Sequence, residues 1–231
     1  YVYTISSAAF AQITDPDFPG ASTVTYMDGY GIFSQPNSQQ FFITSLLDFT
    51  TVDALDFASA ESQPDLLKRV FADHSELWLF GEKSIEVWQN TGAADFPFER
   101  LGGTRAERGC GATFSVAKCD NTVFWLGDDG IIYRAEGYQP IRISTESVEL
   151  SISQMGIFSD AEGFSYDIDG HKFYVLSFPV GGTTWVYDVA TQLWHEIQSD
   201  GGQWRAKWAV QIGNGRYCGD SISGNIGLLS L

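Results

Sequence analysis

Residues 121–133, NTVFWLGDDGIIY, decide the fold. A first apolar run, VFWL, leads into the cluster GDDG, and a second apolar run, IIY, follows. Gly and Asp tolerate the positive φ of a tight turn, so two short β-rich runs around such a cluster predict a hairpin. The same pattern recurs at residues 76–88 and 172–187. The chain is therefore expected to be a series of short antiparallel strands.

Units with a common strand order repeat along the chain, at about residues 21–62, 68–102, 111–146, 161–199 and 203–231. The second strands of successive units lie 46, 46, 50 and 44 residues apart, counted at Gly31, Leu77, Val123, Phe173 and Tyr217. Four short strands repeated every ~40–50 residues are typical of β-propeller blades. One such sheet cannot bury both faces alone, and packing blades around an axis covers them. The prediction is an all-β propeller of about five four-stranded blades, with residues 1–231 as one domain.

The two ends of the chain are expected to complete this ring. Residues 1–14 contain two short strands, at 2–6 and 9–13, which are predicted to close the ring together with 203–231. Helical pattern is limited to residues 64–70, where Asp65 follows Pro64 as a helix start. An open pair of β-sandwich sheets is the alternative fold, because sandwiches also have short strands at regular spacing. The missing initiator Met and the apolar last residues suggest a piece of a longer protein.

The charge balance opposes a conventional nucleic-acid binder. Thirteen basic residues stand against 29 acidic ones, a formal net charge of −16, whereas binding to phosphates depends on Lys and Arg. This charge serves solubility or, on a sharper interpretation, keeps a surface from sticking to nucleic acid that passes nearby. No apolar run approaches the ~20 residues of a membrane helix, and no signal peptide is recognisable. No membrane association is expected.

Sites for chemistry are not predicted. Three cysteines without a C-x-x-C pair and three scattered histidines argue against a disulfide framework or a zinc site, and favour free, buried thiols. The acidic pairs at 15/17, 128/129 and 167/169 stand beside Gly or Pro, where Asp ordinarily bonds its own turn. The residues 167–170, DIDG, begin like a calcium loop but lack the Glu that would complete it. We expect no enzyme activity, no metal and no cofactor.

Seven tryptophans could form a carbohydrate platform, but most recur at equivalent places in predicted strands. Core packing explains them better, because each ring buries a large area. The residues 186–189, VYDV, followed by Trp194, resemble a kelch-type blade, in which Asp188 would cap a turn and Trp194 would pack between blades.

Several stretches, in order, resemble the packaged-DNA-stabilisation proteins, or tail accessory factors, of short-tailed phages. They are 48–61 (DFTTVDALDFASAE), 77–81 (LWLFG), 84–88 (SIEVW), 90–92 (NTG), 96–98 (FPF), 107–110 (ERGC) and 125–129 (WLGDD). The resemblance spans about residues 8–149, and the remainder fits as further blades. It implies a virion protein in several copies below the portal and adaptor rings, which joins them to the tail needle and tailspikes and retains packaged DNA. It also implies a location in the virion tail and, during assembly, in the host cytoplasm.

The contact surfaces are expected on long inter-strand segments, at 48–53, 89–97 and 102–108, whose length a tight turn does not require. The predicted interaction residues are Asp48, Asp53, Asp95, Arg105, Glu107 and Arg108. The last three, with Arg100, could form interfacial ion pairs, or Glu107 and Arg108 could simply join one blade to the next. The alternative function is a glycan-binding, lectin-like propeller, based on the tryptophans. A propeller hydrolase would need paired carboxylates at one mouth of the channel.

Overall fold

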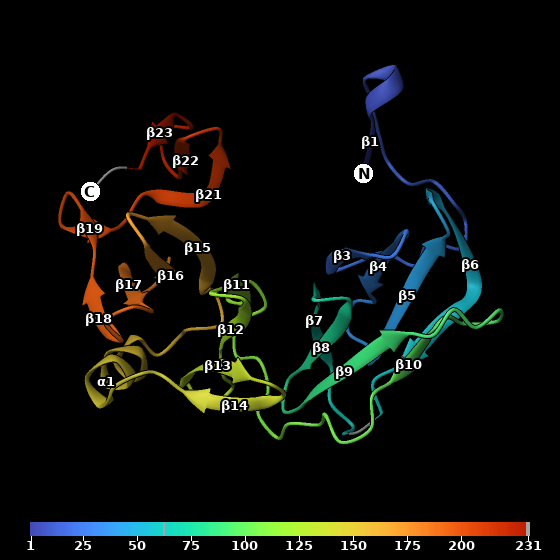
Figure 1. Ribbon diagram of the computed structural model, residues 1–231, viewed down its shortest axis with the longest axis horizontal. Helices are drawn as coiled ribbons and strands as arrows, with labels where there is room; N and C mark the ends of the chain where they lie inside the picture. Colours follow the sequence, from blue (N-terminus) through green and yellow to red (C-terminus); the bar gives the residue numbers. More distant parts are fainter. Residues whose placement is uncertain (62, 230–231) are drawn as a thin grey trace. The chain divides into compact units, whose positions relative to one another are not determined.

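The computed structural model describes residues 1–61 and 63–229, and nearly all of its regular structure is β-sheet. The chain divides into two compact units, Tyr1–Gly109 (unit 1) and Cys110–Leu231 (unit 2), each of which is described by itself. In both units short antiparallel strands follow one another in chain order (Figure 1). Among the described residues, no helix has the length and apolar character needed to span a membrane.

Unit 1 contains two four-stranded sheets in which each strand pairs with the next along the chain. The first sheet consists of β3 (Thr23–Met27), β4 (Tyr30–Ser34), β5 (Gln40–Ser45) and β6 (Asp48–Ser59). The second consists of β7 (Leu67–Asp73), β8 (Glu76–Gly81), β9 (Ile85–Asn90) and β10 (Phe98–Arg100). A separate pair, β1 (Val2–Thr4) and β2 (Ala9–Ala11), flanks a 3-10 turn at Ile5–Ser7 that stands away from these sheets in Figure 1.

Unit 2 repeats this arrangement. Its first sheet consists of β11 (Ala117–Cys119), β12 (Thr122–Leu126), β13 (Ile132–Glu136) and β14 (Gln139–Arg142). After helix α1 (Glu146–Met155) comes the sheet of β15 (Glu162–Ile168), β16 (His171–Phe178), β17 (Thr183–Asp188) and β18 (Leu193–Glu196). The rest comprises a short pair, β19 (Gln198–Ser199) and β20 (Gly202–Gln203), and a three-stranded sheet of β21 (Ala206–Ile212), β22 (Gly215–Asp220) and β23 (Ile226–Leu228).

The hairpin predicted at residues 121–133 is confirmed as β12 and β13. Leu126 faces Ile132 in the register, and the Gly127 amide donates to the Ile131 carbonyl at 2.7 Å. The Asp129 carboxylate accepts from the Ile131 amide at 3.1 Å and from the Tyr133 hydroxyl at 2.8 Å. Asp129 is therefore a turn residue, as its position beside glycine predicts.

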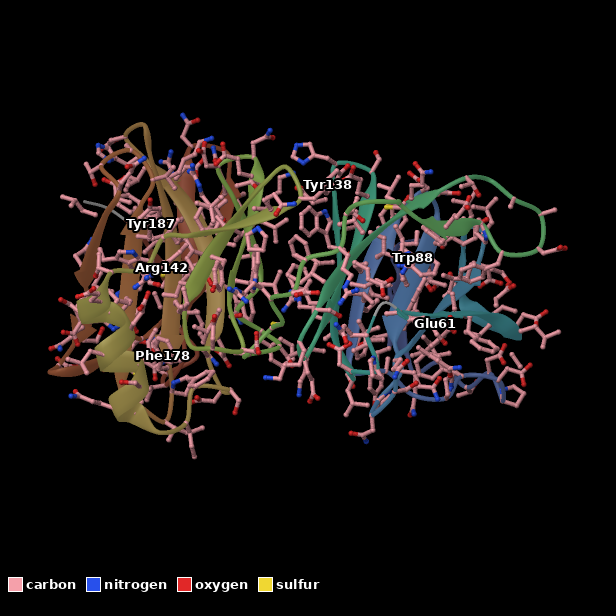
Figure 2. The ribbon with its side chains drawn as sticks, turned by 90° about the horizontal axis from the view of Figure 1, so that it is seen from below. Glu61, Trp88, Tyr138, Arg142, Phe178 and Tyr187 are labelled. Carbon is pink, nitrogen blue, oxygen red and sulfur yellow. The ribbon has the colours of Figure 1, made fainter. Side chains whose placement is uncertain are left out.

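The second strand of each four-stranded sheet is largely buried on both faces, which explains its apolar sequence. In β8, Leu77 and Leu79 pack in a cluster with residues of the first sheet. Trp78 and Phe80 point to the other face and stack at 6.2 Å between ring centroids. Burying one such side chain fully contributes roughly 1.5–3 kcal/mol. Trp88, labelled in Figure 2, meets Phe41 edge to face at 5.1 Å.

The core of unit 2 joins its two four-stranded sheets to helix α1. Val148 and Ile152 of the helix are buried in a cluster that includes Tyr174 and Phe178. Phe178 and Tyr187 are labelled in Figure 2. The Asp188 carboxylate accepts from the Thr191 hydroxyl at 2.8 Å, and the Trp194 ring donates to the Ile143 carbonyl of the preceding sheet at 2.8 Å. Both roles expected from the kelch-like pattern are confirmed.

Neighbouring sheets are also tied at, or just before, their first strands. In unit 1, the Val70 and Ala72 amides of β7 donate to the Thr23 and Thr25 hydroxyls of β3, each at 3.1 Å. In unit 2, the Gly163 amide donates to the Phe114 carbonyl at 2.8 Å. A Cβ atom at Gly163 would clash with the backbone of Ser115, so only glycine permits this approach. Such bonds fix the relative position of the two sheets within each unit.

Three local predictions are wrong. Residues 64–70 are not helical: their second half belongs to β7, because pairing with β8 outweighs local propensity. The Asp65 carboxylate instead accepts from the Lys83 and Ser84 amides of the β8–β9 turn, at 2.6 and 3.0 Å. The helix lies at α1, where Thr145 precedes it, Glu146 and Glu149 occupy the first turn and Gly156 ends it.

The segment 48–53, predicted as a loop, belongs to strand β6, because a turn of only two residues separates it from β5. In the repeat unit 111–146, a first strand is expected from the pattern at 112–117, but the structure has it only at Ala117–Cys119. The first part of the segment 112–117 forms a turn, in which the Ser115 hydroxyl donates to the Ala112 carbonyl at 2.7 Å and accepts from the Leu126 amide at 3.1 Å. These side-chain bonds take the place of a strand ladder.

Closure of the ring stays a prediction. In the described residues β1 pairs with β2, and the sheet of β21, β22 and β23 has three strands rather than the four of the complete sheets.

Candidate interaction surfaces

Unit 1 has two ends, defined by its turns. Val70 and Ala72 of β7 bond to Thr23 and Thr25 of β3, so the residue numbers increase in the same direction on both strands. Strands β3 and β7 are therefore parallel. Turns 28–29, 46–47, 74–75 and 91–97 therefore lie at one end, called the first end. The connections 35–39, 60–66 and 82–84, with 101–109, lie at the other, called the second end, where residue 62 is outside the described part.

Hydrogen bonds between turns support this division. At the first end the Asn90 side-chain amide donates to the Asp28 carboxylate at 3.1 Å, and the Leu47 amide donates to the Gly29 carbonyl at 2.8 Å. At the second end the Leu67 amide donates to the Ser38 carbonyl at 2.9 Å. Each end thus presents turns from both sheets.

The two ends differ in charge. The chain has no Lys or Arg before Lys68, although eight acidic residues precede it: Asp15, Asp17, Asp28, Asp48, Asp53, Asp56, Glu61 and Asp65. At the first end stand Asp28, Asp48, Asp73, Glu76 and Asp95, with no Lys or Arg. The second end mixes both signs, including an ion pair of Lys68 and Glu82 at 2.8 Å. The first end is therefore an acidic surface formed by Asp28, Asp48, Glu76 and Asp95, whereas Asp73 is buried and lies 2.7 Å from His74.

Asp48 and Asp53 organise their own backbone. The Asp48 carboxylate accepts from the Thr50 amide and hydroxyl, at 3.0 and 2.7 Å, and from the Thr51 hydroxyl at 2.8 Å. The bonds from Thr50, followed by those from Thr51, lower the pKa of Asp48. The Asp53 carboxylate accepts from the Leu55 amide at 2.9 Å. Both residues are exposed, so their carboxyl groups are accessible to a partner.

The other predicted residues fall into two places. Asp95 is exposed in the 91–97 turn of the first end. Arg105, Glu107 and Arg108 belong to the second end, where Arg105 and Glu107 pair at 3.0 Å and the Arg108 guanidinium donates to the Glu107 carbonyl at 3.0 Å. These contacts join near neighbours in sequence, and an exposed pair contributes at most ~1 kcal/mol. The six predicted residues thus form no single cluster.

Exposed apolar residues near the acidic ones were missed by sequence reasoning. Leu46 and Leu47 occupy the β5–β6 turn and are exposed, and Leu47 has φ of 60°. Leu55 of β6 is 80% exposed. A Leu-Leu pair in a tight turn, where Gly, Asn or Asp is usual, was a signal in the sequence.

A groove of about 650 Å³ runs beside β3 in unit 1. Val24, Tyr26 and Phe49 contribute to its wall, together with Tyr1 and Val2 of the N-terminal segment. All of its lining residues are uncharged. The groove offers mainly apolar contact area, with Gln12, Ser22, Thr23 and Thr25 as polar lining residues and no charged side chain.

The tryptophans do not form a sugar-binding row. Trp78 and Trp125 are buried, and Trp204 stacks on Phe164 at 6.1 Å between ring centroids. Trp208 is half exposed, beside an irregularity in β21. Core packing is confirmed for the buried rings, and glycan binding gains no support from this arrangement.

No metal centre is formed by the residues that the structure describes, since no three His, Cys, Asp or Glu side chains come together to hold an ion. The carboxylate of Asp15 accepts from the Asp17 amide at 2.9 Å and from the Val52 amide at 3.3 Å, which is a structural role. The buried Cys110 thiol donates to the Ala112 carbonyl at 3.1 Å, Cys119 is also buried, and Cys218 is half-buried; none of the three forms a disulfide in the described residues.

These features define an acidic all-β protein of repeated four-stranded antiparallel sheets. The chain belongs to the phage stabilisation family, whose model, described as "Bacteriophage P22 Gp10, beta-propeller", matches residues 1–231. The family resemblance and the propeller class predicted from sequence are confirmed, and the sandwich alternative is set aside. The family is one of phage structural proteins that stabilise packaged DNA.

Among solved structures, BamB from Moraxella catarrhalis is similar over 88% of this chain and 59% of that chain, with 11% sequence identity and a TM-score of 0.45. The chain thus spans less than two thirds of that protein's length. No curated protein matches the chain.

Proposed function

We propose that this chain is part of a tail protein that docks below the portal and adaptor ring of a short-tailed phage. There it joins the ring to the tail needle or tailspikes and keeps packaged DNA from leaking. The observation that carries the proposal is the match of the phage stabilisation family over the whole chain. In this proposal the protein is made in the host cytoplasm and functions in several copies in the virion tail.

The structure of unit 1 supports a role in docking. Propeller sheets form a rigid support, and their turns present contact surfaces at two ends. The first end is acidic and the second mixes charges, so the two ends suit different neighbours. A net charge of −16 also disfavours adhesion to DNA, which a protein beside the DNA exit must avoid.

The test uses DNA-filled heads that lack this protein. The full-length protein is added, the heads are sedimented, and bound protein and retained DNA are both measured. We expect binding and reduced DNA loss, with heads given bovine serum albumin as the control. Absence of binding, or binding without any effect on DNA loss, would overturn the proposal.

A further inference from the structure

Strand β6 is unlike the other outer strands. It has 12 residues, whereas β10, β14 and β18, the outer strands of the other four-stranded sheets, have 3, 4 and 4. A sheet edge leaves backbone groups unpaired, so proteins keep exposed edges short or protect them with Lys or Pro. Strand β6 has neither residue. The Val52 amide of this strand donates to the Asp15 carboxylate of the N-terminal segment at 3.3 Å, whereas residues 53–55, just beyond it, are exposed.

A bulge interrupts the edge. Phe42 pairs with Phe57 and Thr44 pairs with Val52, so Ile43 alone lies opposite four residues of β6. These four residues, 53–56, are called the β6 bulge. The bond from the Leu55 amide to the Asp53 carboxylate shapes it. Bulges re-aim side chains at sheet edges, and here Leu55 is 80% exposed.

The surroundings of Leu55 specify its partner. Phe57 follows it on the same strand and is 43% exposed, which extends the apolar area. Asp53 and Asp56 stand on either side of Leu55 in the sequence. Partial burial, together with the negative charge of Asp53, raises the pKa of Asp56. A cationic neighbour would relieve this repulsion, whereas a second copy of the same bulge would increase it.

We propose that the β6 bulge docks into an apolar pocket bordered by Lys or Arg on a different virion protein. Leu55 fills the pocket, and Asp53 and Asp56 pair with its basic border. The acidic residues orient the encounter and the leucine supplies the buried area. The inference rests on the proposed function, since that function places the partner in the virion.

The experiment compares three full-length proteins on DNA-filled heads: the wild type, Leu55→Arg and Leu193→Arg. Leu193 is the matched control, because it is 65% exposed on β18, another outer strand. We expect Leu55→Arg to bind at least ten-fold more weakly than the wild type and Leu193→Arg to bind equally well. Thermal unfolding by circular dichroism verifies that all three fold alike.

A second variant, Asp53→Asn with Asp56→Asn, separates charge from folding. It removes both carboxylates without adding bulk, and we expect weaker binding with a smaller dependence on salt. Wild-type binding with no loss in either bulge variant would overturn this inference and leave the proposed function intact. Failure of the wild type to bind would overturn the proposed function, and the inference with it.

Discussion

Replacing Thr23 by Val removes the hydroxyl that ties β3 to β7 while nearly keeping the side chain's shape. Thr23 is buried, its Oγ1 accepts from the Val70 amide at 3.1 Å, and it lies 2.7 Å from the Ser34 hydroxyl. Ser34 still accepts from the Thr23 amide at 3.0 Å after the change. The Val70 amide keeps no such partner. A buried donor left unsatisfied costs about 1–3 kcal/mol, so we expect a loss of about 2 kcal/mol.

Thr25→Val is the matched control. The Thr25 hydroxyl accepts from the Ala72 amide at the same distance, 3.1 Å, but both residues are half-buried. Water can therefore replace the lost bond, and the expected cost is below about 1 kcal/mol. The two substitutions differ mainly in solvent access.

Two measurements on the full-length protein test the expectation. Urea unfolding gives the loss of stability, and hydrogen exchange of the Val70 amide reports the broken bond directly. Faster exchange at Val70 in Thr23→Val, with little change at Ala72, is the expected result. If Thr23→Val costs no more than Thr25→Val, or if exchange at Val70 is unchanged, the hydroxyl does not join the two sheets.

Three further outcomes are expected. Gly163→Ala should destabilise the protein by about 1–3 kcal/mol in urea unfolding, because its Cβ would clash with neighbouring backbone, whereas Gly102→Ala, with open space around it, should be nearly neutral. Cys119 should be alkylated far more slowly than Cys218 at pH 8, as followed by mass spectrometry, because burial raises the pKa of Cys119 to about 12; equal rates would contradict its burial. The pKa of Asp56 in the folded protein is raised above its ordinary value of 3.8. The folded state therefore loses stability relative to the unfolded state as pH rises from 3.8 through the raised pKa. Asp56→Asn should therefore be slightly more stable than the wild type at pH 7, by at most about 0.5 kcal/mol, and no more stable at pH 3, as measured by thermal unfolding.

The blades could be predicted from sequence because their signals are local and repeated. The apolar second strands, such as the one containing Leu77, are bounded by Gly and Asp turns at nearly constant spacing. Helix α1 carries local signals too, in Thr145, Glu149 and Gly156, but it lies in the connection between the two four-stranded sheets of unit 2, where the strand repeat predicts no element. The helix expected after Pro64 failed for a different reason, since pairing with β8 decides the conformation there.

The candidate surfaces were less predictable than the blades. The length of the segments 48–53 and 89–97 is the reason why Asp48 and Asp95 are expected to be contact residues. The structure places both at the first end of unit 1, together with Asp28. That grouping depends on the parallel direction of β3 and β7, which no local pattern reveals. The exposure of Leu55 depends on a register shift between β5 and β6, and a register shift is a property of two strands together.

The chain-order pairing of the strands bears on how the protein is made. Each four-stranded sheet is complete within one short stretch of chain, so its contacts form between residues that leave the ribosome in close succession. The bonds from Val70 to Thr23 and from Ser165 to Lys118 each span 47 residues and must wait for the following sheet. Synthesis can thus proceed sheet by sheet, and each finished sheet offers an ordered edge on which the next one assembles.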